Sequence, residues 1–468
     1  MSHPHKWLFV GLFALACFSC TAPLKSSFTA VPLSNSLPPL AESNINVPVK
    51  VVMTPFLEKA AVLIPKEVTS EGWPGYLQTS CDFHYKYRFV PGGFTFACNN
   101  NQVQVSLAGS YQVAGEKCVC AFNHQTSPWI GGSCGFGKES MRKTTIFISS
   151  QLQFQPNYTV HTRTSAQKAV AQEKCVVSMF GLDVTQQVMD SIKSSTNAFC
   201  YSVDSIVNGM DFTSTTKTLA ERINKKIPLD KYGYLKINPS AVKMGTMNSV
   251  KDTLQATLGI SCFPELHSDS TNNFSASFLP PLQAAEPVPG ITLYTNARYD
   301  YNFINTVING LIKDTSFEIE GNKVILKNVQ VNGAEEGKIE IMVDFDGDKK
   351  GSLFLTGTPR LDTASQVVFI PDLDYSLKSS NLILALGKTF FSNKILRALR
   401  EKANISVKDL VEQNRKSIDA QLNKKIMEGV FSTGQIKDIR LLSLVVGKDI
   451  LQAQTCTRAQ ASIIINNL

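Results

Sequence analysis

Beyond its first twenty residues, the sequence lacks any long hydrophobic run. No later run reaches the roughly 18–20 apolar residues that a transmembrane helix requires, so we expect no membrane-spanning helix. The sequence also lacks a dense block of Lys and Arg, and the formal net charge of its 468 residues is only +8. Such a charge favours contact with anionic surfaces but is not the concentrated basic patch of a nucleic-acid-binding protein. We therefore predict no nucleic-acid partner.

The sequence has few residues that could support catalysis or bind a metal ion. The histidines after residue 6 are His84, His124, His161 and His267, which form no i, i+4 pair and have no adjacent acid. Glycine-rich phosphate-binding loops are absent. The segment Gly131-Gly132-Ser133-Cys134-Gly135 matches the G-x-S-x-G nucleophile elbow, but the glycines that follow Ser133 make a poor helix start. We predict a glycine-rich loop there and a protein that is not an enzyme, with no catalytic residue, metal site or cofactor.

An acidic segment, Asp344-Phe345-Asp346-Gly347-Asp348, has the carboxylates that a calcium ion prefers. An EF-hand loop counted from Asp344 would need Gly at its sixth position and Glu at its twelfth, where this sequence has Lys349 and Leu355. We therefore predict an Asp-Gly hairpin turn between a strand that ends at Phe345 and one that starts at Ser352.

The N-terminus has the pattern of an export signal. A short basic segment that includes Lys6 precedes an apolar run, Trp7–Ala16, of signal-peptide length. The run ends in Ala16-Cys17-Phe18-Ser19-Cys20, which resembles a bacterial lipoprotein signal. We predict a signal peptide over residues 1–19 and acylation of Cys20; cleavage before Cys17 and a secreted protein without lipid are the alternatives. The predicted partner is thus a membrane, bound through an N-terminal lipid anchor. Since no Asp follows Cys20, resemblance to Gram-negative lipoproteins implies the bacterial cell envelope, at the outer membrane facing the periplasm.

Cysteines are frequent enough to suggest cross-links. Nine cysteines follow Cys20, and in an oxidising compartment such a set is first interpreted as disulfides. Five of them fall within 54 residues, and we predict at least two disulfides among these candidates: Cys81, Cys98, Cys118, Cys120 and Cys134. Buried free thiols are the alternative. Cys118 and Cys120 would lie on one face of a strand, without a second cysteine or histidine pair at a zinc-like spacing.

The predicted order of strands and helices occurs twice along the chain. A Ser/Pro-rich tether is predicted over residues 20–44, and alternating apolar residues then predict a strand, a helix, several strands and further helices. The same order returns after a Pro-rich joint at residues 280–290. Ile223-Asn224-Lys225-Lys226-Ile227 is echoed by Leu422-Asn423-Lys424-Lys425-Ile426, near the end of a predicted helix in each half. We predict two related domains, at residues 45–280, with a Cys-rich insertion, and at residues 281–468.

Three segments carry a resemblance to a known family. They are Ile45-Asn46-Val47-Pro48-Val49, Gly233-Tyr234-Leu235-Lys236-Ile237-Asn238-Pro239 and Gly351-Ser352-Leu353-Phe354-Leu355-Thr356-Gly357-Thr358-Pro359. Together they are similar to a family of bacterial lipoproteins that is classified only as a domain of unknown function. The resemblance covers nearly the whole mature chain, and it brings no functional residues with it.

The repeated order of strands followed by a long helix also resembles the tubular lipid-binding (TULIP) superfamily, which includes bactericidal/permeability-increasing protein. This resemblance implies an α+β fold of two tandem duplicated domains, each a curved antiparallel sheet wrapped around a long helix. The implied function is that of an envelope lipoprotein that binds a lipid or another apolar ligand in a tubular groove. The alternative is a structural or scaffold lipoprotein without a ligand. Ligand-binding residues and protein partners stay unassigned.

Overall fold

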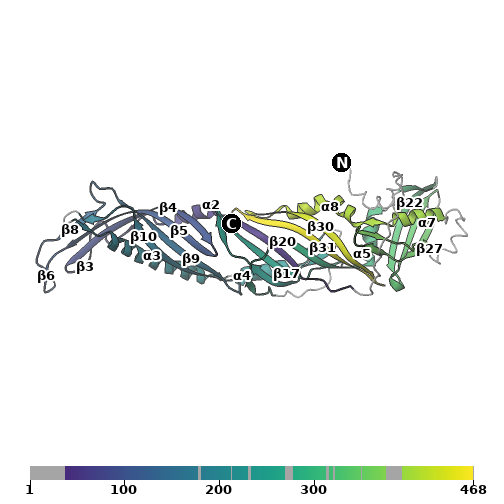
Figure 1. Cartoon of the computed structure of the whole chain (residues 1–468), viewed down its shortest axis with the longest axis horizontal. Helices are drawn as coiled ribbons and strands as arrows, with labels where there is room; N and C mark the ends of the chain where they lie inside the picture. Colours follow the sequence, from purple (N-terminus) through teal and green to yellow (C-terminus); the bar gives the residue numbers. More distant parts are fainter. Residues whose placement is uncertain are drawn as a thin grey trace.

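The structure, a computed structural model, describes residues 37–177, 181–211, 213–229, 233–268, 278–312, 316–319, 322–348, 350–375 and 393–466. The predicted signal peptide, Cys17, Cys20 and residues 20–36 of the predicted tether lie outside these ranges. The molecule is elongated, and three sheets follow one another along its long axis (Figure 1).

The middle of the molecule is a sheet of twelve strands, which we call the middle sheet. Its strands are β1 (Ser43–Val52), β13 (Ile227–Pro228), β14 (Tyr234–Lys236), β15 (Pro239–Met244), β16 (Asn248–Val250), β17 (Thr253–Cys262), β18 (Glu265–His267), β19 (Leu282–Ala284), β20 (Gly290–Asp300), β29 (Lys424–Met427), β30 (Val430–Val446) and β31 (Ile450–Ile465). Strand β1 pairs with β17 on one side and with β20 and β31 on the other. Segments from both sides of the predicted joint at residues 280–290 therefore belong to one sheet.

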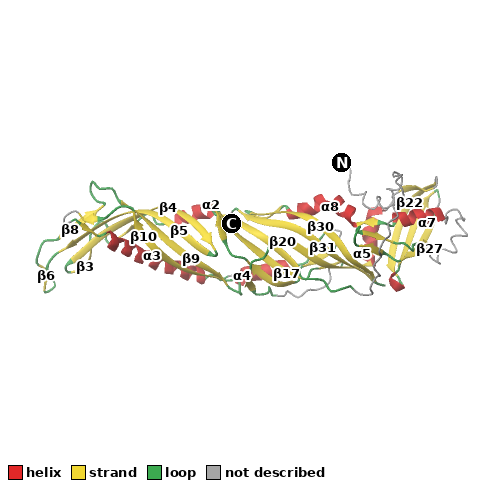
Figure 2. Ribbon diagram, viewed as in Figure 1, coloured by secondary structure: helices red, strands yellow, loops and turns green. Residues whose placement is uncertain are grey.

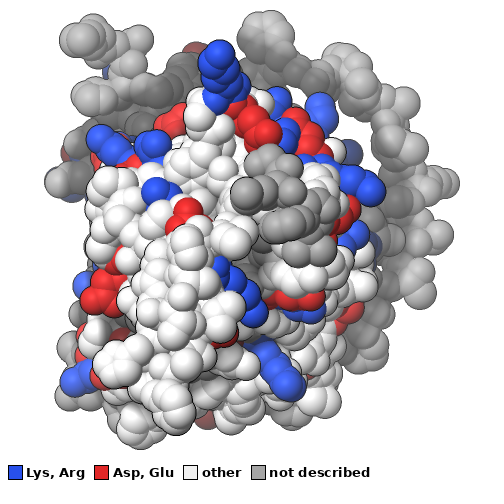
Figure 3. Space-filling view, turned by 90° about the vertical axis from the view of Figure 1, so that its left-hand side faces the viewer, with Lys and Arg blue, Asp and Glu red and all other residues white. Residues whose placement is uncertain are grey.

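Two long excursions from the middle sheet build the two ends of the molecule. The first lobe (residues 53–226) follows β1, and its largest sheet has seven strands. These are β2 (Val68–Thr69), β3 (Leu77–Ser80), β4 (Phe83–Asn99), β5 (Gln102–Lys117), β8 (Ile130–Cys134), β9 (Arg142–Phe154) and β10 (Val160–Ala171). Two small ladders, β6 (Cys120–Ala121) with β7 (His124–Gln125) and β11 (Val176–Val177) with β12 (Leu182–Asp183), complete it. Figure 3 looks onto the outer end of this lobe, where uncharged atoms fill the centre of the view.

The second lobe (residues 301–423) follows β20 and forms the opposite end of the molecule (Figure 1). Its five-stranded sheet contains β21 (Ser316–Ile319), β22 (Asn322–Gly333), β23 (Ile339–Gly347), β24 (Gly351–Gly357) and β27 (Asp374–Tyr375). A three-stranded sheet contains β25 (Arg360–Asp362), β26 (Val367–Phe369) and β28 (Ile405–Ser406). The turn between β23 and β24 confirms the predicted hairpin in the acidic segment.

Helices stand at the beginning and end of each lobe. The helices of the described residues are α2 (Thr54–Leu63), α3 (Thr185–Asn208), α4 (Thr213–Asn224), α5 (Tyr301–Ile312), α7 (Asn393–Lys402) and α8 (Val407–Leu422), besides a single 3-10 turn, η3 (Glu335–Gly337). The echoed sequence falls where the last helix of each lobe returns to the middle sheet. Asn224 at the end of α4 donates its side-chain amide to the carbonyl of Ala220, and Asn423 at the end of α8 donates to that of Asp419. The two asparagines thus satisfy the same kind of unpaired carbonyl at a helix C-terminus.

Helix α8 is tied to the edge of a sheet by polar side chains. Asp419 accepts the Ile436 N–H of β30 at 3.0 Å, and Arg415 donates to the Ile436 carbonyl at 3.1 Å. Asn423 both donates to and accepts from the backbone of Gly434 in the same strand. Because an open strand edge exposes unpaired N–H and C=O groups, these side chains replace the missing neighbouring strand.

The lobes use the same device at their own sheet edges. In the first lobe, Asn197, Asp204 and Asn208 of α3 accept backbone N–H groups of β10 at 2.7–2.8 Å. In the second lobe, Asn305 and Asn309 of α5 each pair with both the N–H and the C=O of one residue in β22. These helices are therefore fixed beside edge strands by side-chain amides and carboxylates.

The predicted fold class is wrong. In the part of the chain that the structure describes, strands account for 55% and helices for 19%, in several sheets, so the fold is mainly β and not α+β. In the described part of the chain no long helix is wrapped by a sheet, as the TULIP-like prediction of two duplicated domains required. Figure 2 shows α3 and α8 lying along strands at the outside of the sheets. The prediction considered the apolar stripes of the helices and missed their asparagines and aspartates, which bind the helices to sheet edges.

A sequence typical of a hairpin turn lies inside a strand. Strand β4 continues through Pro91-Gly92-Gly93 with a shift in register against β5. The chain reverses instead at Asn100 and Asn101, whose φ angles are 48° and 61°. Two consecutive residues with positive φ are the signature of a tight hairpin turn, and asparagine tolerates this conformation best among non-glycine residues.

Candidate functional site

The middle sheet has one apolar face and one mostly polar face. Residues directly opposite each other in a sheet share a face. Val47 of β1 lies opposite Leu258 of β17, which lies opposite Met244 of β15. On the other side of β1, Val49 lies opposite Ile463. The apolar face therefore runs without a break across at least four strands.

Thirteen residues define this apolar face. They are Val242, Met244, Leu254, Leu258, Ile260, Ile45, Val47, Val49, Val51, Ile463, Ile465, Ile291 and Leu293. Leu258 is 40% exposed, and the other twelve are only half-buried. The hydrophobic clusters of the described residues lie in the lobes, one of them extending to Val446 and Leu451 of the middle sheet, and contain none of the thirteen. A continuous apolar surface that the described residues leave partly exposed is a characteristic of interaction and ligand sites.

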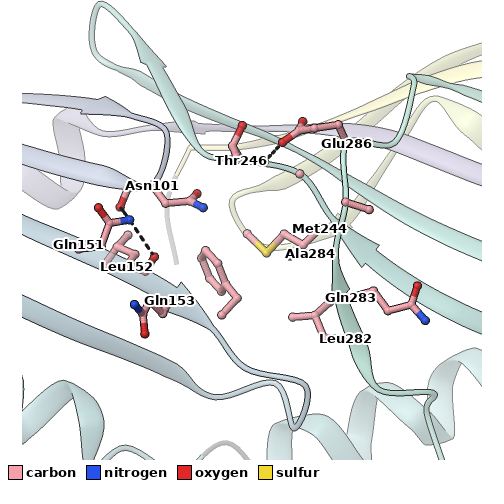
Figure 4. Close-up of a pocket in the computed structure, with 13 residues that line it drawn as sticks. Asn101, Gln151, Leu152, Gln153, Met244, Thr246, Leu282, Gln283, Ala284 and Glu286 are labelled. Atoms are coloured by element: carbon pink, nitrogen blue, oxygen red, sulfur yellow. Dashed lines mark hydrogen bonds between the residues drawn. The ribbon is translucent and has the colours of Figure 1, made fainter.

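At the junction with the first lobe, the apolar face continues into a cleft. The cleft has a volume of about 500 Å³, within the range of about 300–1,000 Å³ that is usual for ligand sites. Met244 and Leu282 line it from the middle sheet, and Leu152 and Phe154 line it from β9 of the first lobe. Figure 4 shows Leu152 on one side of the gap and Met244 and Leu282 on the other. Two sheets therefore present apolar side chains to the same cavity.

Polar residues also line the cleft, and none of its lining residues is Lys, Arg or His. These polar side chains belong to Asn101, Gln151, Gln153, Thr246, Gln283 and Glu286. The Glu286 carboxylate accepts the Thr246 backbone N–H at 2.9 Å, as the dashed line in Figure 4 shows. The lining thus combines apolar side chains with amide groups and one carboxylate.

Hydrogen bonds on both sides hold the cleft open between the lobe and the sheet. The tip of the β4–β5 hairpin docks onto the middle sheet, where Asn101 donates its N–H to the Met247 carbonyl at 3.1 Å and accepts the Met247 N–H at 2.6 Å. On the other side, Leu282 donates its N–H to the Pro156 carbonyl at 2.9 Å. These contacts join the first lobe to the middle sheet on both sides of the cleft.

Comparison with protein families assigns the chain. A family model described as "Domain of unknown function (DUF4403)" matches residues 41–465, almost the whole described chain. The chain belongs to the DUF4403 family. This confirms the part of the predicted resemblance that concerned a domain of unknown function over nearly the whole mature chain.

Other comparisons add little to the family assignment. A search among curated proteins found no match. Among solved structures, P47 from Clostridium botulinum A2 aligns over 91% of this chain and 97% of that chain, with 7% sequence identity and a TM-score of 0.19. A similarity this low carries no argument about fold or function. The DUF4403 chain must therefore be interpreted from its own residues.

A second polar cluster lies in the first lobe around His84. Its ring stacks between Tyr76 and Trp129, with centroids 4.2 and 3.8 Å away, and its Nε2 lies 2.9 Å from Glu116. Burial and the hydrogen bond to Glu116 raise the pKa of Tyr76 to about 12. The hydrogen bond from His84 lowers the pKa of Glu116. Since both ring faces of His84 are covered, we interpret this cluster as structural.

Two of the histidines have acid partners in space, although no acid is adjacent to either in the sequence. His84 lies directly opposite Glu116 in the β4–β5 register, and His267 Nε2 lies 3.2 Å from Glu265 in the same strand. The first partner could have been found from the sequence only if the turn at Asn100 had been placed correctly. Ser133, which the sequence placed in a loop, lies in β8, without the strand-to-helix turn of a nucleophile elbow.

Two disulfides are present in the described chain, both in the first lobe. Cys81 pairs with Cys120, and Cys134 pairs with Cys175, which the sequence analysis did not include among its candidates. Of the predicted candidates, Cys98 and Cys118 are free thiols. One disulfide therefore lies within residues 81–134, and the second joins Cys134 to Cys175, which lies outside this segment.

Membrane and metal expectations can be examined only for part of the chain. Among the described residues, none of the helices has both the length and the apolarity needed to cross a bilayer. The same residues contain no cluster of three or more metal-ligating side chains. The lipidation residues Cys17 and Cys20 lie outside the described ranges, so the lipid anchor stays a prediction.

Proposed function

We propose that the protein binds a lipid or another apolar ligand on the apolar face of the middle sheet, with one end of the ligand in the cleft beside the first lobe. The observation that carries this proposal is the apolar face that the described residues leave partly exposed, on which Leu258 is 40% exposed. A monomeric protein gains stability by covering such a surface. An aliphatic ligand would cover it and would gain roughly 0.8 kcal/mol for each buried methylene group.

The cleft would fix the orientation of such a ligand on the sheet. Leu152, Phe154, Met244 and Leu282 would contact the apolar part of the ligand. The amides and the Glu286 carboxylate in the lining would contact a polar end that carries hydroxyl or other hydrogen-bond donors. A few placed polar groups around an apolar pocket are the usual design of a small-molecule site.

We further propose that the protein acts in the bacterial envelope and is attached to the membrane through acylated Cys20. The basis is the N-terminal signal in the sequence. Two disulfides support an oxidising location, because disulfides are rare in cytosolic proteins. Fatty-acid labelling of wild-type protein and of Cys20→Ala tests the anchor. Retained label in the variant would move the site to Cys17, and unlabelled wild-type protein would reject lipidation.

Native mass spectrometry tests the ligand. Protein purified without detergent is expected to carry apolar ligand, or to take up lipid from phosphatidylethanolamine/phosphatidylglycerol vesicles. Leu258→Trp would place a bulky ring on the apolar face, where the exposure of Leu258 leaves room for it, and should reduce uptake at least fivefold without unfolding. Gln460→Trp is the matched control, because Gln460 is exposed on the opposite face of the same sheet.

Two results would contradict the proposal. Wild-type protein that has a clean apo mass and takes up no lipid would favour the scaffold function. Equal loss of uptake in Leu258→Trp and Gln460→Trp would show that the effect comes from general destabilisation. Circular dichroism of both variants checks that they are folded.

A further inference from the structure

Three cysteines meet at the outer end of the first lobe. Cys81 and Cys120 form a disulfide, and the free Sγ of Cys118 lies 3.8 Å from the Sγ of Cys120. The Cys118 thiol also lies 3.4 Å from the carbonyl oxygen of Cys81, to which it donates. Among the free cysteines of the described residues, Cys118 alone is not fully buried. This thiol is therefore next to a disulfide and accessible to solvent.

The chain brings these three cysteines together at the end of the β4–β5 ladder. Cys81 lies in the turn between β3 and β4, directly before Asp82. Phe83 lies opposite Lys117 in the ladder, and Cys118 then donates its N–H to the Asp82 carbonyl at 3.0 Å. Cys118 therefore lies beside the turn that contains Cys81, and Cys120 follows two residues later at the start of β6.

We infer that Cys118 and Cys120 are alternative partners of Cys81 in a thiol–disulfide exchange site. The Cys118 thiolate attacks the Sγ of Cys81, so that the Cys81–Cys118 bond forms as the Cys81–Cys120 bond breaks. Cys120 leaves as a thiolate and takes up the proton that Cys118 lost. The number of disulfides and thiols is unchanged, so the step needs no oxidant or reductant.

Attack on Cys120 gives a less favourable product. A Cys118–Cys120 bond would join residues two apart, whose Cα atoms are about 6.6 Å apart in an extended chain. This is close to the upper limit of about 6.8 Å for disulfides. The Cα atoms of the observed Cys81–Cys120 pair are 6.2 Å apart. Cys81 is therefore the sulfur that both other cysteines share.

Exchange in this site should be slow at neutral pH. Burial, and then the charge of Asp82, raise the pKa of the Cys118 thiol. Since the thiolate is the attacking species, exchange should accelerate as the pH rises. The hydrogen bond from Ser80 and, to a smaller extent, the charge of Lys117 lower the pKa of Asp82. Before and after exchange, the end of the lobe presents one free thiol.

Alkylation of the native full-length chain tests the exchange. N-ethylmaleimide is added at pH 7 and at pH 8.5, the reaction is stopped with acid, and labelled cysteines are identified by peptide mapping. The expected result is label on both Cys118 and Cys120, at a rate at least fivefold higher at pH 8.5. Label on Cys118 alone at both pH values would overturn the inference.

A variant gives a second, independent readout. In Cys120→Ser, Cys118 should replace the lost partner, so that a Cys81–Cys118 disulfide forms in at least half of the molecules. The matched control is Cys175→Ser, in which Cys134 has no third cysteine of this kind and should be labelled once the protein is denatured. The inference would be contradicted if both Cys81 and Cys118 were labelled in Cys120→Ser while its circular dichroism stayed unchanged.

Discussion

The two lobes begin and end alike but are stabilised by different means. Each starts with a helix directly after a strand of the middle sheet and ends with a helix directly before one. The first lobe contains two disulfides, and cysteines provide two of the four buried residues in its main hydrophobic cluster. The second lobe contains no cysteine. Its buried clusters consist of aliphatic side chains and Phe345.

The difference shows what the longer lobe needs. Long strands such as β4 and β5 reach far from the middle sheet, and most of their residues are only half-buried. A region that buries little apolar surface depends on covalent cross-links for stability. The second lobe has two aliphatic clusters, which include Leu355 at 4% exposure and Leu373 at 2%. Packing there makes cross-links unnecessary.

Removing the buried disulfide should produce the largest difference in stability between the two lobes. Cys134→Ser combined with Cys175→Ser opens a cross-link between residues 41 apart in sequence. We expect a loss of about 4 kcal/mol in the free energy of unfolding of the first lobe, mainly from the greater entropy of the unfolded chain. Tryptophan fluorescence during urea unfolding measures it selectively, because Trp73 and Trp129 are both in this lobe and only Trp7 lies elsewhere.

Leu355→Ala is the corresponding change in the second lobe. It should cost about 3 kcal/mol through the lost burial and the cavity, and the tryptophan transition should stay where it is in wild-type protein. A reducing agent should shift the fluorescence transition in wild-type protein and in Leu355→Ala alike. Equal shifts of the fluorescence transition in the disulfide and Leu355 variants would show that the lobes unfold as one unit.

Strands were the predictable part of the fold, because alternation of apolar residues is a local signal. The first strand of the first predicted domain, β1, follows from such a pattern, and the hairpin in the acidic segment follows from the local signal of its Asp-Gly turn. The placement of the helices did not, because it depends on single polar residues such as Asn197 and Asn305 that pair with strand edges. Nothing local distinguishes these asparagines from solvent-exposed ones.

The sequence predicted the type of candidate site, an apolar binding surface, but not the residues that form it. Alternation in β1 predicted an apolar sheet face, yet only the pairing of β1 with β17, β20 and β31 shows how far that face extends. The cleft depends on the hairpin tip at Asn101 docking on Met247, 146 residues away. The pairing of Cys134 with Cys175 is long-range in the same way, and spacing alone cannot reveal it.

Removing one edge-binding asparagine from each lobe should have a smaller effect. Asn305→Ala leaves both the N–H and the C=O of Val331 without their partner, whereas Asn197→Ala frees only the Ala166 N–H. We expect losses of about 2 and about 1 kcal/mol, since each unsatisfied buried group costs about 1–3 kcal/mol at most and water relieves part of it. Hydrogen exchange of the Val331 and Ala166 amides checks this, and unchanged exchange rates would contradict the role of these side chains.

The smallest expected difference between the lobes is their response to acid. The hydrogen bond from His84 lowers the pKa of Glu116 below its usual 4.5. A carboxyl group with a lowered pKa in the folded state stabilises the fold fully above the unfolded pKa, and this stabilisation is lost as the pH falls through the folded pKa. In Glu116→Gln the first lobe should therefore lose less stability below pH 4.5 than in wild-type protein. The difference should be less than about 1 kcal/mol because Glu116 is partly exposed to screening solvent.

In the second lobe, burial raises the pKa of Asp372, but hydrogen bonds from Thr358 outweigh it and the net pKa is lowered. Asp372→Asn is thus the matched control: it should leave the acid response of tryptophan fluorescence unchanged, and an equal effect of both variants would show that the lobes are coupled.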